Sequence, residues 1–134
     1  MNVVAIIGRV TKELEISYTR QGTPNCTFTI AIQRDYKNSN GTYDADFIQI
    51  VAWREVAQLL VTHVKKGEQI GINGQLRSRS YVDKNGIKKY ITEVRAQRIK
   101  FLDHKKSDDN FTEQMDSISE NYTAGDEYNE ELEE

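Results

Sequence analysis

Residues 47–76 read FIQIVAW REVAQLLVTHVKKG EQIGINGQL, a strand pattern, a helix pattern and a second strand pattern in succession. In the first part, small aliphatic residues recur at every second position, which is the alternation of a strand with one buried face. These residues are Ile48, Ile50 and Ala52. In the middle part, apolar residues recur at helical spacing. They are Val56, Leu59, Leu60 and Val64. We therefore expect a strand from residue 47, then a short helix, and then a second strand over residues 68–82.

The end of this helix is better marked than its start. Lys65 and Lys66 are expected in the last turn, where cations oppose the helix dipole, and Gly67 follows as a left-handed stop. No capping side chain precedes the helix. The sequence therefore indicates where the helix ends more clearly than where it begins.

The remaining segments also have strand patterns, separated by turn signals. Strands are expected at residues 3–10, continuing after a bend into 14–18, at 26–33, and at 87–102. Residues 37–45 are polar and rich in turn formers, so a long exposed loop is expected there. Asn85-Gly86 favours a tight reversal between the last two strands, because both residues tolerate positive φ.

This order, with one helix between the third and fourth strands, predicts an all-β chain whose domain is a five-stranded OB barrel. We assign residues 1–102 to this domain. Residues 103–134 are polar and acidic, and we expect them to form a flexible, disordered C-terminal tail because they contain too little apolar surface to offset the entropy of ordering.

The charge of the chain divides at the same boundary. Residues 1–102 contain 16 Lys and Arg against 9 Asp and Glu, a net charge of +7. Residues 103–134 contain 2 Lys against 12 Asp and Glu, a net charge of -10. A basic body with an acidic tail is expected when the body binds a polyanion.

Several classes of protein are disfavoured. Cys26 is the only cysteine, so it cannot form an internal disulfide, and no Cys/His spacing suggests a structural metal. No signal peptide or membrane-spanning run is present. We expect a cytoplasmic protein with no cofactor, no metal and no membrane partner.

Strand alternation also predicts which side chains face outward. In residues 47–53 the outward set is Phe47, Gln49, Val51 and Trp53. In the next strand Ile70, Ile72, Gly74 and Leu76 are expected to face inward. The outward set there is Gln69, Asn73, Gln75, Arg77, Arg79 and Tyr81. Exposed rings beside guanidinium groups suit a single strand of nucleic acid, because bases stack on rings while cations follow the phosphates.

Five segments resemble the bacterial and phage single-stranded DNA-binding proteins of the homotetrameric OB-fold type. They are NVVAIIGRV at 2–10, ISY at 16–18, FIQIVAW at 47–53, KKG at 65–67 and GQLRSR at 74–79. The resemblance covers residues 2–102, and the last segment is the most specific. It implies a homotetramer that binds and protects single-stranded DNA in replication, recombination and repair.

The resemblance also implies four stacking residues, Tyr36, Phe47, Trp53 and Tyr81. Alternation independently favours Trp53 and Tyr81, whereas Tyr36 has the parity of the core-like Phe28 and is supported only by its place beside Arg34 at a loop edge. We expect the phosphates to be neutralised by Arg34, Lys66, Arg77, Arg79, Arg9 and Lys88. The tail lacks the terminal proline and phenylalanine usual in the family. Two roles stay open for it: a segment that binds replication and recombination proteins, with Tyr128 and Leu132 as apolar anchors, or an internal competitor that mimics the charge of DNA.

Three alternatives stay open on the residues alone. A nuclease would need a compact metal-ligand motif, which Asp44, Asp46 and Glu55 do not form, and His63 reads as a surface residue, so no catalytic residue is expected. An adaptor that binds proteins would bind DNA weakly and without salt dependence. An RNA-binding barrel would use the same stacking and phosphate contacts.

Overall fold

The computed structural model describes residues 1–102, and the predictions for residues 103–134, including Tyr128 and Leu132, lie outside the described residues. The strands and helix, in chain order, are β1 Val4–Val10, β2 Ser17–Tyr18, β3 Pro24–Lys37, β4 Tyr43–Trp53, α1 Arg54–His63, β5 Gln69–Val82 and β6 Lys88–Phe101. The predicted order of strands with one helix is confirmed.

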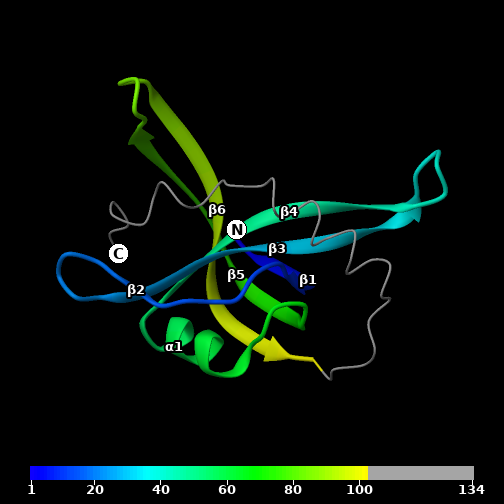
Figure 1. The fold of residues 1–134 in the computed structure, drawn as a ribbon, viewed down its shortest axis with the longest axis horizontal. Coiled ribbons are helices and arrows are strands. Elements are labelled where there is room, and N and C mark those ends of the chain that lie inside the picture. Colours follow the sequence, from blue (N-terminus) through cyan, green and yellow to red (C-terminus); the bar gives the residue numbers. More distant parts are fainter. Residues whose placement is uncertain (103–134) are drawn as a thin grey trace.

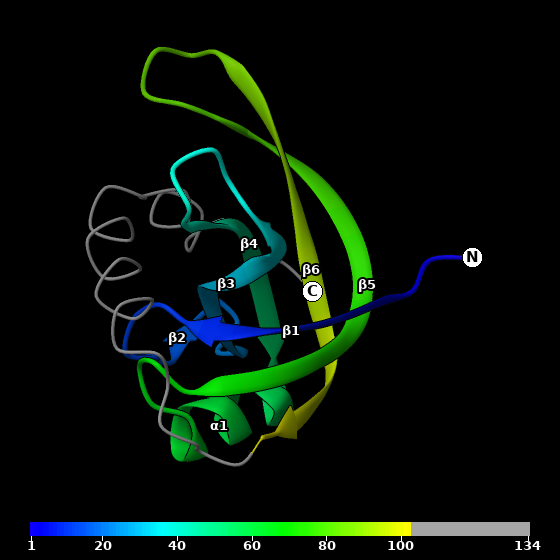
Figure 2. The same cartoon turned by 90° about the vertical axis from the view of Figure 1, so that its right-hand side faces the viewer.

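The sheet closes on itself (Figures 1 and 2). Its strands follow the order β1-β5-β6-β4-β3, and β3 pairs back to β1 through Arg9 with Ala31 and Val10 with Ile30. The pairing of β4 with β6 is parallel and the others are antiparallel. The short strand β2 extends the edge of β3. This is the five-stranded OB barrel that the sequence predicts.

The barrel interior holds the core. Phe28 and Ile30 of β3 and Ile50 of β4 are almost fully buried in it, and Ala57 and Leu60 of α1 close one end. Cys26 lies in the same core, where burial raises the pKa of its thiol to about 11. The thiol therefore stays protonated near neutral pH and serves as a small apolar core residue.

Two glycines allow the backbones to approach closely where the barrel closes. A Cβ on Gly74 of β5 would collide with the carbonyl oxygen of Arg95 on β6, beside a register shift between these strands. A Cβ on Gly8 of β1 would lie 2.6 Å from the carbonyl oxygen of Ala31 on β3. Any larger residue at either position would push paired strands apart.

The helix begins where the sequence predicts it but ends earlier than predicted. It begins without a side-chain cap, as expected, and Arg54 takes a left-handed φ of 54°. It ends at His63, so Lys65 and Lys66 lie beyond its last turn, which corrects the prediction. Gly67 has the expected positive φ, 88°, and its N–H donates to the carbonyl of Val10, which ties the turn to β1.

The predicted long loop at residues 37–45 is also wrong, because β3 and β4 run on as a hairpin and leave only residues 38–42 between them. The Asn38 side-chain oxygen accepts hydrogen bonds from the N–H groups of Asn40 and Thr42, and this organises a tight turn. Polar residues form strands here because backbone hydrogen bonds between β3 and β4 stabilise them, without a buried apolar face.

Leu76 is a further correction. It shares the inward parity of Ile70 and Ile72, yet its side chain is 50% exposed. Beyond this residue the β5–β6 hairpin leaves the barrel and projects into solvent (Figures 1 and 2). On this hairpin, side chains at the alternate positions that face the core inside the barrel are therefore exposed to solvent.

Within residues 1–102 the structure has no helix with the length and apolar character that crossing a bilayer requires.

We predict that Gly74→Ala lowers the free energy of unfolding by at least about 2 kcal/mol, because the added methyl must displace the Arg95 backbone. Urea denaturation followed by circular dichroism measures the change. Gly71→Ala is the matched control, since its Cβ would meet nothing closer than 3.4 Å. Equal urea midpoints for the two variants would contradict the close-approach argument.

Candidate nucleic-acid interface

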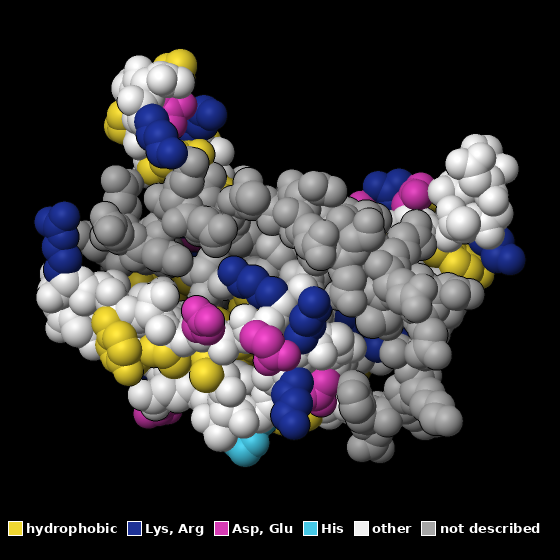
Figure 3. Space-filling view, in the orientation of Figure 1, with side chains coloured by type: hydrophobic (Ala, Val, Ile, Leu, Met, Phe, Trp, Pro, Cys, Tyr) yellow, Lys and Arg dark blue, Asp and Glu magenta, His cyan; other side chains and the backbone are white. Residues whose placement is uncertain are grey.

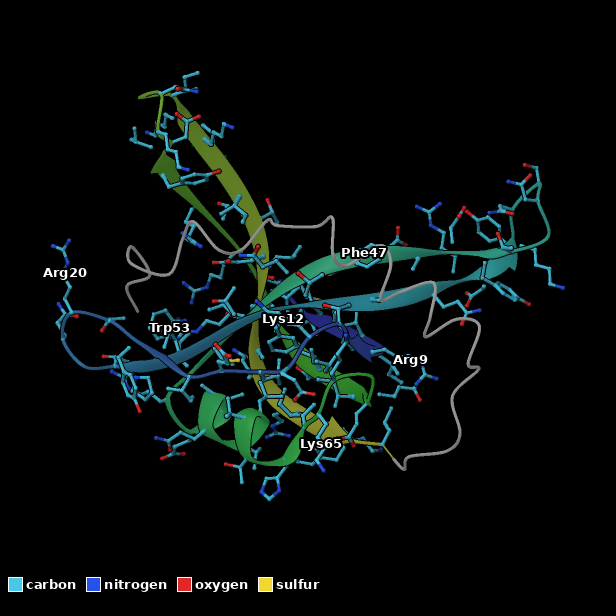
Figure 4. The ribbon with its side chains drawn as sticks, in the orientation of Figure 1. Arg9, Lys12, Arg20, Phe47, Trp53 and Lys65 are labelled. Atoms are coloured by element: carbon cyan, nitrogen blue, oxygen red, sulfur yellow. The ribbon has the colours of Figure 1, made fainter. Side chains whose placement is uncertain are left out.

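The outward face of the barrel runs continuously across β3, β4, β6 and β5. Trp53 of β4 lies opposite Asn25 of β3, and Phe47 lies opposite Ala31. Figure 4 shows Phe47 and Trp53 at separate points along β4. Because paired residues share a face, the alternation predicted for β4 is confirmed: Ile50 and Ala52 are in the core, while the residues between them are on the other side.

The aromatic residues on this face are less exposed than the sequence suggests. Trp53 is only 7% exposed and packs with Val51 in a cluster separate from the barrel core. Phe47 is half-buried against Ala31. The outward position of Trp53 is thus correct, but the expectation of an openly exposed ring is not.

Tyr36 and Tyr81 lie on the two projecting hairpins rather than on the barrel wall. Tyr36 is exposed near the end of β3, within the stretch between Gln33 and Lys37 where the pairing register shifts. The alternation of residues 26–32 does not pass through such an irregularity, so parity does not fix the side on which Tyr36 lies. Tyr81 is half-buried near the end of β5, opposite Lys89.

A largely buried polar network on this face ties three strands together. The Glu93 carboxylate of β6 is 3% exposed; it accepts a 2.9 Å hydrogen bond from Gln49 Nε2 and a 2.9 Å ion-paired bond from Arg79 Nε. The charge of Arg79 is therefore engaged by a buried carboxylate rather than presented to solvent. The sequence did not reveal this pairing, because Gln49 and Glu93 are 44 residues apart.

Arg77 of β5 and Arg95 of β6 lie on the same face of their paired strands, and the charge of Arg54, at the start of α1, also acts on Arg95. Arg95 of β6 lies beside Val51 and opposite Gln75. Burial, with the positive charges of Arg77 and Arg54, lowers the pKa of Arg95. The sequence prediction included Arg77 but not Arg95 or Arg54. Arg95 could have been found from the inward parity of Val94 and Ala96 on either side of it.

The remaining predicted cations are dispersed. Arg9 of β1 lies beside Ala31, on the row that leads to Phe47, and its Nη1 donates to the Gly67 carbonyl at 3.3 Å. Lys66 lies in the turn after α1, where its N–H donates to Glu13 at 3.4 Å. Lys88 is opposite Val82, which places it on the reverse face of the β5–β6 hairpin from Tyr81.

Arg34 is held in a forked ion pair on the β3–β4 hairpin. Its Nη2 lies 2.8 Å from Asp46 Oδ1, and its Nε donates to the same carboxylate. These hydrogen bonds lower the pKa of the Asp46 carboxyl, so Asp46 stays charged near neutral pH. A phosphate that contacts Arg34 must compete with this carboxylate.

Within residues 1–102, no three His, Cys, Asp or Glu side chains gather in a group that could hold a metal ion. Asp44 and Asp46, which were considered above as metal ligands, contact Asn38 and Arg34 respectively.

We predict that Glu93→Gln lowers the free energy of unfolding by about 3 kcal/mol, because it removes the buried negative charge that pairs with the partly buried guanidinium of Arg79. Urea denaturation measures the loss. Asp46→Asn is the matched control: it breaks an ion pair that is exposed, and the midpoint should hardly move. A Glu93→Gln protein as stable as the parent would show that the network does not hold the sheet.

Comparison with known proteins agrees with this arrangement. The model of the single-strand binding protein family matches residues 1–102. Single-stranded DNA-binding protein 3 of Listeria innocua is 40% identical over 107 residues, 80% of this chain and 67% of the relative. Single-stranded DNA-binding protein 4 of Streptococcus agalactiae is 38% identical over 118 residues, 88% of this chain and 86% of the relative. Single-stranded DNA-binding protein A of Bacillus subtilis is 39% identical over 105 residues, which are 78% of this chain and 61% of the relative. The chain belongs to the single-strand binding protein family.

Proposed function

We propose that this chain binds single-stranded DNA with little sequence preference on the outward face of its barrel, and that it acts as a binding protein rather than an enzyme. The observation that supports this most directly is the row of Phe47 and Trp53 on β4 beside Arg95. The family match and the names of the relatives point the same way. In this role the protein covers and protects single strands during replication, recombination and repair.

Stacking is the main source of affinity in this proposal. Phe47, Trp53, Tyr81 and Tyr36 accept bases, each worth about 1–3 kcal/mol by alanine substitution. Because Trp53 is 7% exposed, a base stacks on it only after local rearrangement uncovers the ring. Every base offers a π-face, which is why little sequence preference is expected.

We propose that the phosphate contacts come mainly from Arg77, Arg9 and Arg34. Arg77 is exposed on the same face as Arg95, and Arg9 lies on the row that ends at Phe47. Arg34 contributes when phosphate displaces Asp46. We propose that Arg79 acts mainly through Glu93, by holding the strands in register.

We expect DNA to quench the fluorescence of Trp53, the only tryptophan of the chain. Oligo-dT is titrated at several salt concentrations, and the logarithm of affinity should fall with the logarithm of salt by about 0.7 per phosphate neutralised. Phe47→Ala should weaken binding by about 1–3 kcal/mol. Tyr18→Ala is the control, because this exposed ring lies at the end of β2, away from the Phe47 row. Failure to bind in both the fluorescence and a mobility assay would refute the proposal.

We also propose that the chain forms a homotetramer, which lets one strand be wrapped with high avidity. The support is an open edge of β1. Residues 4–9 pair with β5 along one edge, whereas β3 pairs along the other only at Arg9 and Val10. Val3 and Ile7 are exposed beside that edge. An open apolar edge is suited to pairing with another copy.

Sedimentation equilibrium should give four times the 15.5 kDa chain mass. Ile7→Lys should reduce the assembly, because it places a charge beside the open edge. Circular dichroism checks that the variant folds. A monomeric parent protein would refute the tetramer, and a folded Ile7→Lys protein of unchanged mass would refute the role of β1.

The acidic residues 103–134 are proposed to recruit replication and recombination proteins, with Tyr128 and Leu132 as apolar anchors; the support is their net charge of -10. The proposed location is the cytoplasm of a bacterium or of a phage host.

A further inference from the structure

The projecting part of the β5–β6 hairpin has two exposed faces. Val94 lies at the barrel mouth on inward parity and is 1% exposed, whereas Val82 and Tyr90, farther along on the same parity, are 60% and 74% exposed. Figure 2 shows the hairpin rising clear of the barrel and of α1. Side chains that would face a core inside the barrel therefore face solvent on the hairpin.

The reverse face carries an aromatic ring with a cation on it. Tyr90 is opposite Ser80, and Lys88 is opposite Val82, so the two lie on the face away from Tyr81. Lys88 Nζ lies 5.5 Å from the centre of the Tyr90 ring. Tyr90 is the most exposed aromatic ring of residues 1–102. A nucleotide has a base that can stack on such a ring and a phosphate that can contact the neighbouring ammonium group.

The tip of the hairpin is basic. Lys84, Lys88 and Lys89 lie within it against one carboxylate, Asp83. Asp83 accepts hydrogen bonds from the N–H groups of Asn85 and Ile87, and Lys89 pairs with it at 3.4 Å. Figure 3 shows hydrophobic and basic side chains together on this projection, at the upper left. The charge of the tip suits a polyanion.

We propose that Tyr90 and Lys88 form a second contact for single-stranded DNA, in which a base stacks on Tyr90 and Lys88 meets a phosphate. The strand on the outward face passes Tyr81, turns around the hairpin and continues on its reverse side. This inference rests on the proposed function. The polar residues Ser78, Ser80 and Thr92 interrupt the apolar surface around Tyr90, so the face lacks the continuous patch typical of a protein-docking site.

The contact should matter only for a strand long enough to reach it. We compare an oligo-dT of about 10 nucleotides, within the range that one OB barrel covers, with one about three times longer. Tyr90→Ala should weaken binding of the longer strand about 10-fold and leave the shorter one within about 2-fold. Tyr90→Phe keeps the ring and should restore parent affinity. Ile87→Ala, at another exposed apolar residue of the same tip, is the matched control and should bind like the parent.

Trp53 fluorescence separates the two proposals. If the parent protein quenches with DNA but Tyr90→Ala binds the long strand as the parent does, the second contact is refuted and the outward face stands. If the parent protein does not bind, the proposed function itself falls. An equal loss on short and long strands, or a change in sedimentation mass with Tyr90→Ala, would also refute the second contact, because either result points to fold or assembly.

Discussion

Barrel closure is the constraint on which the other features depend. The parallel pairing of β4 with β6 brings Val51 beside Arg95, and the pairing of β1 with β3 brings Arg9 beside Ala31. In the closed barrel the paired backbones approach so closely that a side chain has no space at Gly74 or Gly8. Once the sheet is closed, alternation along a strand separates a core side from a solvent side. That separation places Phe47, Trp53 and Arg95 on one continuous surface.

Two hairpins extend beyond the closed part, and this extension changes what strand alternation means. Inside the barrel the inward residues of β3 and β4 are buried against α1 and one another. On the β5–β6 hairpin the same parity exposes Leu76 and Tyr90. The hairpin backbone needs no core there, since its hydrogen-bonded ladder and the Asp83 turn hold it. The hairpin thus adds exposed surface to the protein without enlarging its core.

Two carboxylates, one buried and one exposed, pair with arginines of the face. Glu93 engages Arg79 on the face, and Asp46 engages Arg34 at its edge. The first pair is largely buried and joins two strands, whereas the second is exposed to solvent and contributes little to stability. Burial, and then the positive charges of Arg77 and Arg54, lower the pKa of Arg95. An anion beside Arg95 would relieve this repulsion. The face thus contains one buried ion pair that holds its strands together and one ion pair that is exposed to solvent.

The sequence alone determined the order of strands, the helix, the hairpin turn at Asn85-Gly86 and the outward parity of Trp53. These follow from local rules, because backbone geometry fixes the alternation of side chains and glycine marks reversals. Only the tertiary structure decided that Leu76 is exposed, that Trp53 is covered, and that Glu93 neutralises Arg79. Each of these depends on which distant strand lies alongside and where the hairpin leaves the barrel. Local alternation carries no information about such long-range pairing, so the composition of the surface could be predicted but the division of its charges could not.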